Sequence, residues 1–391
     1  MSEALVLDVL LIVMLVGYVV YGFRNGLSRS LFVIAGVVAG IIGAFFLAPI
    51  VAAWVAMPML RVVVTVIVVI GLVAAGNALG AAIGRGVRRG IERGPLSGID
   101  RLLGAIMTGV VAALAASVIG TSVAQLGVPL LSKAIAGSTV LRTINTLTPD
   151  PVEALMAQLR GYLIDKGLPI ISGALGTTPV IPSLDTGSAA LNTAAQSVVR
   201  ITGNAFACGV SQAGTGFVVA DDRIVTNAHV IAGVTEPVIE APDGQTLSGT
   251  IVYFDPIDDL AVIAVPGLDA LPLTLGGTLT VGTDAAVEGY PYGGPFSSGA
   301  ASVISVSSPL VADIYGDTRA PREVYTLAAD VRQGNSGGPL LTLDGTVAGV
   351  VFATSAETAN VGYAMTMTEL TPVATQATTL TAAVSSGECI G

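Results

Sequence analysis

Three residue types at separated points of the chain could together activate a nucleophile. His229, the only histidine, lies in the segment TNAHV at 226–230. Asp255, Asp258 and Asp259 follow it, and Ser336 lies in the segment GNSGGPL at 334–340. A serine hydroxyl attacks well only when a base takes its proton, as imidazole can near neutral pH, and a carboxylate holds that imidazole in the required tautomer. The order His, Asp, Ser predicts acyl-transfer chemistry at Ser336.

The glycines around Ser336 are a second chemical signal. Glycine adopts backbone conformations that are closed to other residues, so this segment can form an unusual turn. Such a turn would direct the amides of Gly334 and Ser336 to one point and form an oxyanion hole, where loss of one donor typically lowers the rate by about 10²–10³. We predict His229 and Ser336 as catalytic residues, and no metal or organic cofactor is implied.

Each signal has a plainer explanation when it stands alone. A single histidine is commonly an incidental core or surface residue, a Gly-Gly pair after serine commonly belongs to a hairpin, and Asp259 could be a solvated loop carboxylate. Because neighbouring residues of a strand face opposite sides, only one of Asp258 and Asp259 can face His229. The residues alone leave that choice open.

Short strands are the elements that must position these residues. From about residue 199, β-rich runs alternate with clusters of Gly, Pro, Asn and Asp; the runs cover 216–220, 224–226, 250–254, 260–265, 285–289, 324–328 and 346–352. Many short strands with frequent turn signals predict an all-β sandwich or barrel.

The first third of the chain has the pattern of a membrane protein. Four apolar runs, at 4–21, 31–55, 62–82 and 102–126, can each cross a bilayer, which needs about 20 apolar residues in a helix. Basic residues gather between the first and second runs and between the third and fourth, so the positive-inside rule places those loops in the cytoplasm. The N-terminus and everything after the fourth run are then extracytoplasmic. GxxxG patterns at 36–40 and 80–84 predict close helix packing.

Charge is distributed unevenly along the chain. Residues 1–133 hold nine Lys/Arg and four Asp/Glu, whereas residues 134–391 hold eight Lys/Arg and 23 Asp/Glu. The acidic second part argues against nucleic-acid binding, which needs a basic face. Residues 134–199 are predicted to be a linker that contains a short amphipathic helix at 152–166.

The two cysteines, Cys208 and Cys389, bracket the β-rich region. Both fall on the side predicted to be extracytoplasmic, where an even pair favours a disulfide. Two unpaired thiols are the alternative.

Residues from about 200 onward resemble the trypsin-like serine proteases, nearest to their HtrA-like branch. The resemblance is carried by GTGFVV at 214–219, by 226–230, by Asp259 before Leu260 and Ala261, and by 334–340. It implies two six-stranded β-barrels with the active site between them, and it selects Asp259 as the third catalytic residue. The apolar N-terminal part resembles the colicin V production (CvpA) family. We therefore predict an all-α membrane domain of four transmembrane helices at 1–133, the linker at 134–199, and an all-β, double-barrel protease domain at 200–391.

The same resemblance points to residues that would bind substrate. Gly349, Val350, Val351 and Phe352 match the strand that pairs with the substrate. Asp330 lies where trypsin carries its pocket acid, which would favour a basic side chain at the cleavage point; a solvated loop carboxylate is the alternative. Asn335 replaces the aspartate that pairs with a freed N-terminus in digestive proteases, so activation by a cut at the start of the domain is not implied.

These observations predict a multi-pass membrane protein whose N-terminus and protease domain are extracytoplasmic (periplasmic). Its activity would be that of a serine endopeptidase on protein or peptide substrates of the cell envelope. The combined resemblance to membrane-anchored periplasmic proteases of actinobacteria implies a role in resistance to acid stress. The alternatives are a peptide-binding sensor or scaffold, and a regulator of a transport module formed by the CvpA-like spans.

Overall fold

The computed structural model describes residues 3–53, 58–91, 97–124, 134–135, 137–149, 152, 170–171, 178–205 and 210–390. The chain divides into two compact units, Asp8–Ser117 and a second unit made of Met1–Leu7 with Val118–Gly391. The predicted helix at 152–166 lies almost entirely outside the described residues, and Cys208 also lies outside them.

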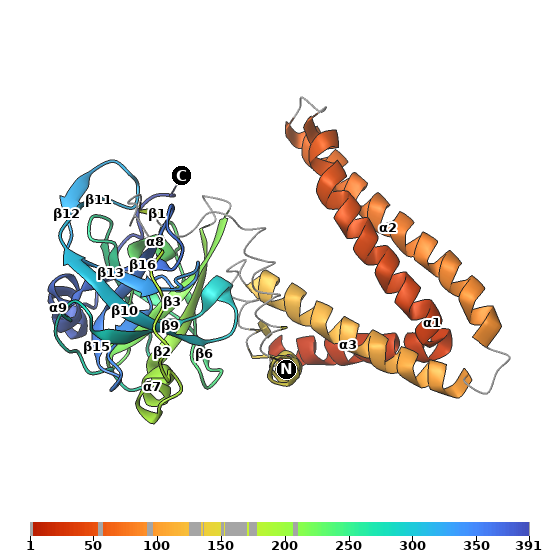
Figure 1. The fold of residues 1–391 in the computed structure, drawn as a ribbon, viewed down its shortest axis with the longest axis horizontal. Helices are drawn as coiled ribbons and strands as arrows, with labels where there is room; N and C mark the ends of the chain where they lie inside the picture. The colour runs from red at the N-terminus through yellow and green to blue at the C-terminus, as the bar shows by residue number, and fades with distance from the viewer. Residues whose placement is uncertain are drawn as a thin grey trace. The chain divides into compact units, whose positions relative to one another are not determined.

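The helical unit consists of α1 (Glu3–Ala53), α2 (Pro58–Ile91) and α3 (Ser97–Ala124). Figure 1 shows that α1 is bent into two segments, and the break falls at Gly26, whose φ of 71° and ψ of 165° are not helical. A Cβ at Gly26 would collide with the carboxylate of Asp100. That carboxylate accepts hydrogen bonds from the backbone N (3.0 Å) and Oγ (2.5 Å) of Ser28. Asp100 therefore caps the open amide end of the second segment.

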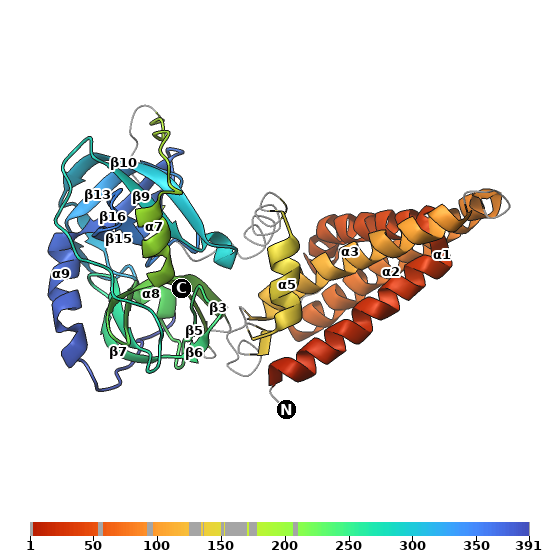
Figure 2. The same ribbon diagram turned by 90° about the horizontal axis from the view of Figure 1, so that it is seen from below.

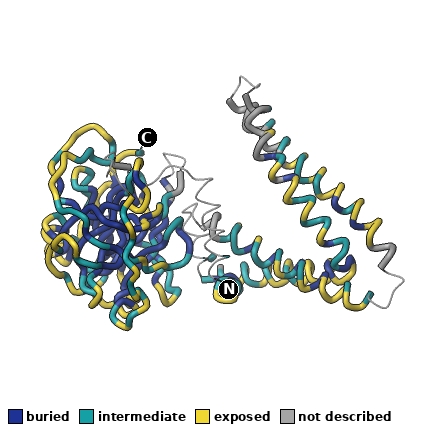
Figure 3. Tube along the Cα trace, viewed as in Figure 1, coloured by how far each residue is buried: buried dark blue, intermediate teal, exposed yellow. Residues whose placement is uncertain are grey.

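Three helices of the described chain are long and apolar enough to cross a membrane, namely Ala4–Ala44, Ile70–Val87 and Ser97–Gly120. The first of them contains the break at Gly26, so the four predicted apolar runs fall on three helices, and the count of four spans stays a prediction. Large apolar side chains such as Leu10, Ile70 and Leu79 are exposed on these helices. Figure 3 shows many exposed positions along these helices. An apolar surface of this extent suits a lipid environment.

Glycines bring the backbones of α1 and α2 together. A Cβ at Gly40 would lie 2.6 Å from the carbonyl oxygen of Leu72, and a Cβ at Gly36 or Gly80 would collide with a carbonyl of the facing helix. The close packing predicted from the GxxxG patterns is confirmed, because small residues allow two helices to approach at this distance.

The second unit contains two seven-stranded sheets and a hairpin. The first sheet has the order β6-β5-β2-β3-β4-β8-β7, with β2 (Val198–Ala205), β3 (Val210–Ala220), β4 (Arg223–Thr226), β5 (Val238–Glu240), β6 (Thr246–Ser248), β7 (Thr250–Asp255) and β8 (Leu260–Ala264). The second has the order β1-β15-β14-β9-β10-β13-β16, with β1 (Ile170–Ile171), β9 (Asp284–Gly289), β10 (Ser297–Ser307), β13 (Val324–Ala329), β14 (Pro339–Leu341), β15 (Val347–Ser355) and β16 (Val361–Thr366). A further pairing of β15 with β16 closes six of these strands into a barrel, and β11 (Leu310–Ala312) pairs with β12 (Arg319–Pro321).

Short helices are also described in this unit. They include α5 (Thr139–Leu147), α7 (Ala189–Ala194), α8 (Ala228–Ile231) and α9 (Met367–Gln376), and 3₁₀ turns cover Ala195–Ser197, Pro291–Gly293 and Ala377–Thr379. The β-rich, all-β protease part predicted from the sequence is therefore present, with one more strand in each sheet than the six that the resemblance implies.

A shared apolar core holds the two sheets against each other. It joins Phe217 and Leu260 of the first sheet to Val350 and Phe352 of the second, and Leu370 on α9 packs against it. Figure 2 shows α9 along the outer side of the strands, and Figure 3 shows that buried residues concentrate in this unit. Each sheet also encloses its own cluster. The segments that carry the predicted catalytic residues are thus attached to strands that pack into one common core.

Candidate active site

His229 and Asp259 form a buried pair. Asp259 Oδ2 lies 2.7 Å from His229 Nδ1, and Asp259 Oδ1 accepts a hydrogen bond of 2.9 Å from the backbone N of His229. The side chain of Asn227 donates to the carbonyl of Asp259 at 2.9 Å. His229 lies on α8, directly after β4, and Asp259 directly precedes β8, the partner of β4. Pairing of two neighbouring strands thus brings the imidazole and the carboxylate together.

The neighbouring aspartates have other contacts. Asp255 accepts hydrogen bonds from the amides of Ile257 and Asp258 and from the hydroxyl of Tyr253. Burial, and secondarily the charge of Asp255, raises the pKa of the half-buried Asp258. Asp259 has a φ of 55°, in the left-handed region. It therefore does not follow the alternation of side chains along a strand that the sequence argument assumed. The structure therefore joins Asp259, and not Asp258, to His229.

Ser336 lies in the loop between β13 and β14, with 2% of its surface exposed. Its Oγ and the Nε2 of His229 are both buried, and neither has a hydrogen-bond partner among the described residues. A Cβ placed on Gly214 of β3 would lie 2.6 Å from the Val230 side chain and 3.1 Å from the Ser336 carbonyl, so the two segments meet across this glycine. Catalytic hydrogen bonds often tighten only when substrate binds, so the unpaired Oγ and Nε2 are compatible with proton transfer between them.

The backbone before Ser336 forms a tight turn. Asn335 N donates to Arg332 O at 3.0 Å, and Gly334 occupies the third position with a φ of 93°, which a type II turn requires there. Gln333 O accepts a bond of 2.5 Å from Tyr292 N. Because a trans peptide directs its C=O and N–H to opposite sides, the amide of Gly334 points away from Tyr292.

Both predicted oxyanion donors are available. Within the described residues, neither the amide of Gly334 nor that of Ser336 donates a hydrogen bond. A Cβ at Gly334 would collide with the carbonyl of Tyr290, so the turn requires glycine. The loop can therefore present two free N–H groups to a developing negative charge.

Thr215 is a site residue that sequence reasoning did not identify. Its hydroxyl donates to Gly334 O at 2.6 Å and accepts from Tyr290 N at 3.0 Å, and its amide donates to Ser336 O at 2.8 Å. The side chain is fully buried. Thr215 thus ties β3 of the first sheet to both ends of the oxyanion turn. The sequence signal available for it was a polar residue between two glycines, just before the apolar end of β3.

Asp330 does not have the surroundings of a pocket acid. Its side chain is 54% exposed and makes a two-point ion pair with Arg332, with Nε–Oδ1 at 2.6 Å and Nη2–Oδ2 at 3.0 Å. Arg332 also donates to the hydroxyl of Tyr292 at 3.3 Å. The Asp330 carboxylate is already neutralised by the Arg332 guanidinium. The structure therefore favours the solvated-carboxylate alternative over a pocket for a basic side chain.

The predicted substrate strand is also corrected. Gly349 and Val350 pair with β14 on one side and with β16 on the other, and Val351 exchanges hydrogen bonds with Gly337 and Gly338. Their backbone groups are occupied, so these three residues cannot receive a substrate strand. From Phe352 onward, β15 no longer pairs with β14. On that side of β15, β1 pairs with Thr354 and Ser355.

Glu288 on β9 is a buried carboxyl that sequence reasoning missed. It has no exposed surface, Oε1 accepts from Ser298 Oγ at 3.2 Å, and Oε2 has no partner among the described residues. Burial raises the pKa of Glu288 to about 7. Glu288 is two residues before Tyr290, whose amide donates to the Thr215 hydroxyl.

Cys389 is disulfide-bonded. Its predicted partner, Cys208, lies outside the described residues, so the pairing stays a prediction. Among the described residues, no group of three His, Cys, Asp or Glu side chains is placed to hold a metal ion.

Comparisons with known proteins agree with this geometry. Residues 214–350 match the family of trypsin-like peptidase domains, and residues 7–149 match the colicin V production protein family. The serine protease Rv3671c of Mycobacterium tuberculosis is 39% identical over 252 residues, which are 62% of this chain and 62% of that protein. The chain thus spans less than two thirds of the length of the curated relatives that it matches.

Further relatives extend the likeness. The putative serine protease HhoA of Synechocystis is 28% identical over 62% of this chain and 56% of its own length. The crystal structure of the Rv3671c protease in its active form is 36% identical, with a TM-score of 0.52, and covers 56% of this chain and 100% of that chain.

Proposed function

Because the chain belongs to the trypsin-like serine proteases and carries a colicin V production-type region before the protease domain, we propose that it is a serine endopeptidase. The observation that carries the proposal is the buried His229–Asp259 pair together with the buried, unpartnered hydroxyl of Ser336, on segments that meet across Gly214. Ser336 Oγ attacks the peptide carbonyl while His229 Nε2 takes its proton, and Asp259 stabilises the imidazolium. The amides of Gly334 and Ser336 stabilise the oxyanion. His229 then protonates the leaving amine, and water releases the acyl group by the same route.

A covalent probe tests this proposal. A fluorophosphonate should label the full-length protein in detergent, and Ser336→Ala should remove the label. Ser307→Ala, at an exposed position at the end of β10, should retain it. A peptide-binding sensor or scaffold would bind peptides without labelling or cleavage. Peptide binding in the absence of both would therefore replace the endopeptidase with that alternative.

We propose further that the protein is anchored by its apolar helices, with the protease domain extracytoplasmic. The apolar surfaces of α1, α2 and α3, the basic loops and the disulfide-bonded Cys389 support this, since disulfides persist in oxidising compartments. Alkaline phosphatase, which is active only outside the cytoplasm, should be active when fused after Thr148. An inactive fusion that is present in full length would reverse the orientation.

The substrates that we propose are proteins or peptides of the cell envelope, cleaved during acid stress. The resemblance to periplasmic proteases supports this role. A role in acid stress requires turnover at acid pH. We therefore expect the full-length enzyme to retain turnover below pH 6. A loss of kcat/KM on acidification to pH 6 would restrict its work to compartments that stay near neutral.

A further inference from the structure

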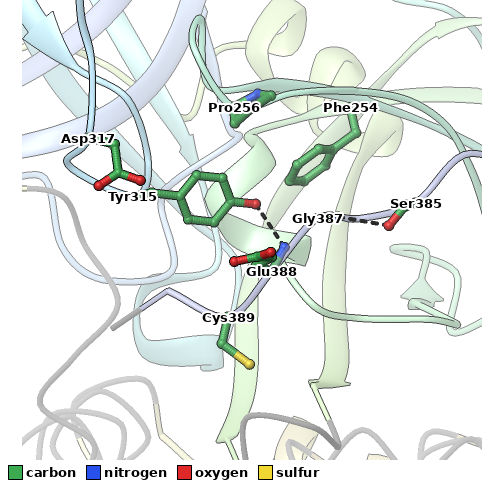
Figure 4. Close-up of a pocket in the computed structure, with 8 residues that line it drawn as sticks. All are labelled: Phe254, Pro256, Tyr315, Asp317, Ser385, Gly387, Glu388 and Cys389. Atoms are coloured by element: carbon green, nitrogen blue, oxygen red, sulfur yellow. Dashed lines mark hydrogen bonds between the residues drawn. The ribbon is translucent and has the colours of Figure 1, made fainter.

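A pocket of about 610 Å³ lies where three segments of the protease domain meet (Figure 4). The segment before Asp259, the turn between β11 and β12, and the C-terminal segment all line it. Its lining residues are Phe254, Pro256, Tyr315, Asp317, Ser385, Gly387, Glu388 and Cys389. The catalytic chemistry described above uses none of them.

The walls of this pocket are fixed by specific contacts. Glu388 N donates to the hydroxyl of Tyr315 at 3.0 Å, as Figure 4 shows. Gly387 has a φ of 71°, and a Cβ there would collide with the Tyr315 hydroxyl and lie 2.9 Å from the Phe254 ring, so only glycine fits. The disulfide at Cys389 anchors the end of the same segment. The pocket is therefore formed in advance of any ligand, which lowers the entropic cost of binding.

The pocket carries negative charge that is not neutralised. The carboxylates of Asp317 and Glu388 line it, and neither has an ion pair or a side-chain hydrogen bond among the described residues. The turn's other carboxylate, Asp313, accepts bonds from three backbone amides and the Thr318 hydroxyl. The charge of Asp255 contributes to the raised pKa of Asp258, so the adjoining loop is acidic as well.

The cations of the neighbouring segments do not line this space. No lysine or arginine is among the lining residues. Arg322 is buried, donates to the carbonyl of Ile257 and lies over the Phe352 ring at 5.4 Å. Arg319 is exposed on β12. An incoming cation would therefore meet two aromatic rings and two uncompensated carboxylates.

This combination is suited to the side chain of lysine or arginine. The faces of Phe254 and Tyr315 attract a cation and cover its apolar stem. Carboxylates at the rim pair with an ammonium or a guanidinium. A neutral apolar side chain of the same length would keep the apolar contact with the rings. It would lose the attraction of a positive charge to the rings and to the carboxylates.

The pocket is connected to both partners of the catalytic pair. Pro256 lies three residues before Asp259, and its carbonyl accepts a bond of 3.1 Å from Ile314 N of the turn. Ser386 O accepts a bond of 3.1 Å from Gly233, four residues after His229. The segments that carry His229 and Asp259 are thus bonded to segments that line or adjoin the pocket.

We propose that this pocket binds a lysine or arginine side chain of the substrate, at a position several residues from the bond that is cleaved. The proposal rests on the endopeptidase function argued above. It assigns the protease a preference that is set away from the primary pocket, where Asp330 is already paired.

A peptide series on the full-length protein in detergent tests the proposal. A parent peptide without basic residues measures turnover, and lysine or norleucine is then placed at each position within six residues of the cleaved bond. One position should show kcat/KM about tenfold higher for lysine, and the difference should shrink as salt screens the charges. The double variant Asp317→Asn/Glu388→Gln should reduce this preference to within about twofold while it cleaves the parent peptide at the wild-type rate.

A matched control separates local charge from net charge. Asp221→Asn/Asp269→Asn removes two exposed carboxylates that do not line the pocket and should keep the preference. No lysine preference at any position overturns the pocket assignment, as does a preference that survives in the pocket variant or is lost equally in the control. Each of these results leaves cleavage of the parent peptide intact, so it is distinct from failure of the endopeptidase proposal, in which the parent peptide is not cleaved.

Discussion

Ionisation of Glu288 should make the protease domain less stable as the pH rises. The folded-state pKa is about 7 and the ordinary value is 4.5, because the carboxyl is buried in β9 and only Ser298 donates to it. Arg200 and Glu240, whose charges affect the pKa of the neighbouring Tyr290, form an ion pair with each other. Between these two pKa values the folded state holds a proton that the unfolded state has released. The contribution to stability is therefore present below pH 4.5 and lost as the pH rises through 7, by about 3 kcal/mol in total.

Hydrogen exchange measures this effect in the full-length protein. The opening free energy of peptides that cover β9 and β10, corrected for the intrinsic exchange rate, should fall by about 3 kcal/mol more in the wild type than in Glu288→Gln between pH 4 and pH 8. Glutamine keeps the shape of the neutral acid and cannot ionise. Glu236→Gln, at an exposed site, should behave as the wild type. Equal pH dependence in the wild type and Glu288→Gln would show that Glu288 is ionised or solvated in the folded state.

Four further substitutions test the site. Asp259→Asn should lower kcat by about 10⁴ because the imidazole loses its orienting carboxylate, whereas Asp258→Asn should change it less than threefold; the reverse result would move the assignment. Thr215→Val leaves two buried backbone groups unpaired at about 1–3 kcal/mol each, and should lower both kcat and the unfolding midpoint; unchanged values would refute its bridging role. Gly334→Ala, strained at its φ of 93°, should lower kcat by about 10²–10³ with KM little changed, whereas a change confined to KM would place the amide outside the oxyanion hole. Arg332→Met breaks a half-exposed ion pair and should lower kcat less than tenfold, with Arg332→Lys in between; a larger loss would show that the pair is essential to the turn.

The catalytic residues could be predicted from the sequence because their chemistry restricts them to few types. One histidine and one serine in a glycine-rich turn leave little choice, and family resemblance then selected Asp259. Strand alternation could not make that selection, since the left-handed backbone at Asp259 lies outside the regular strand. Thr215 was not predicted, because its role depends on how two sheets dock, and no spacing along the chain encodes that contact.

The sequence specifies where the strands lie along the chain better than it specifies which strands are neighbours in a sheet. The apolar runs near 250–254, 260–265 and 285–289 became β7, β8 and β9, since period and composition are local signals. The substrate strand was misplaced because a substrate can pair only where a strand lacks a neighbour, and this depends on the whole sheet. Gly349 and Val350 have the composition of any core strand. Only the strand pairing shows that they have neighbours on both sides. In the helical unit, the first two predicted apolar runs lie on either side of Gly26, where non-helical backbone breaks α1.

The oxyanion turn of this protein is braced by neutral groups of its own loop. Asn335 Oδ1 accepts from Arg332 N at 2.9 Å, and Asn335 N donates to Arg332 O, so one residue closes the turn from both its backbone and its side chain. An amide makes these bonds without a charged partner, which a buried aspartate at this position would need. The remaining supports, Thr215 from β3 and Tyr292 from the segment after β9, come from inside the folded domain. The hole is therefore assembled when the two sheets dock, because Thr215 belongs to the first sheet and the turn that it holds lies between two strands of the second.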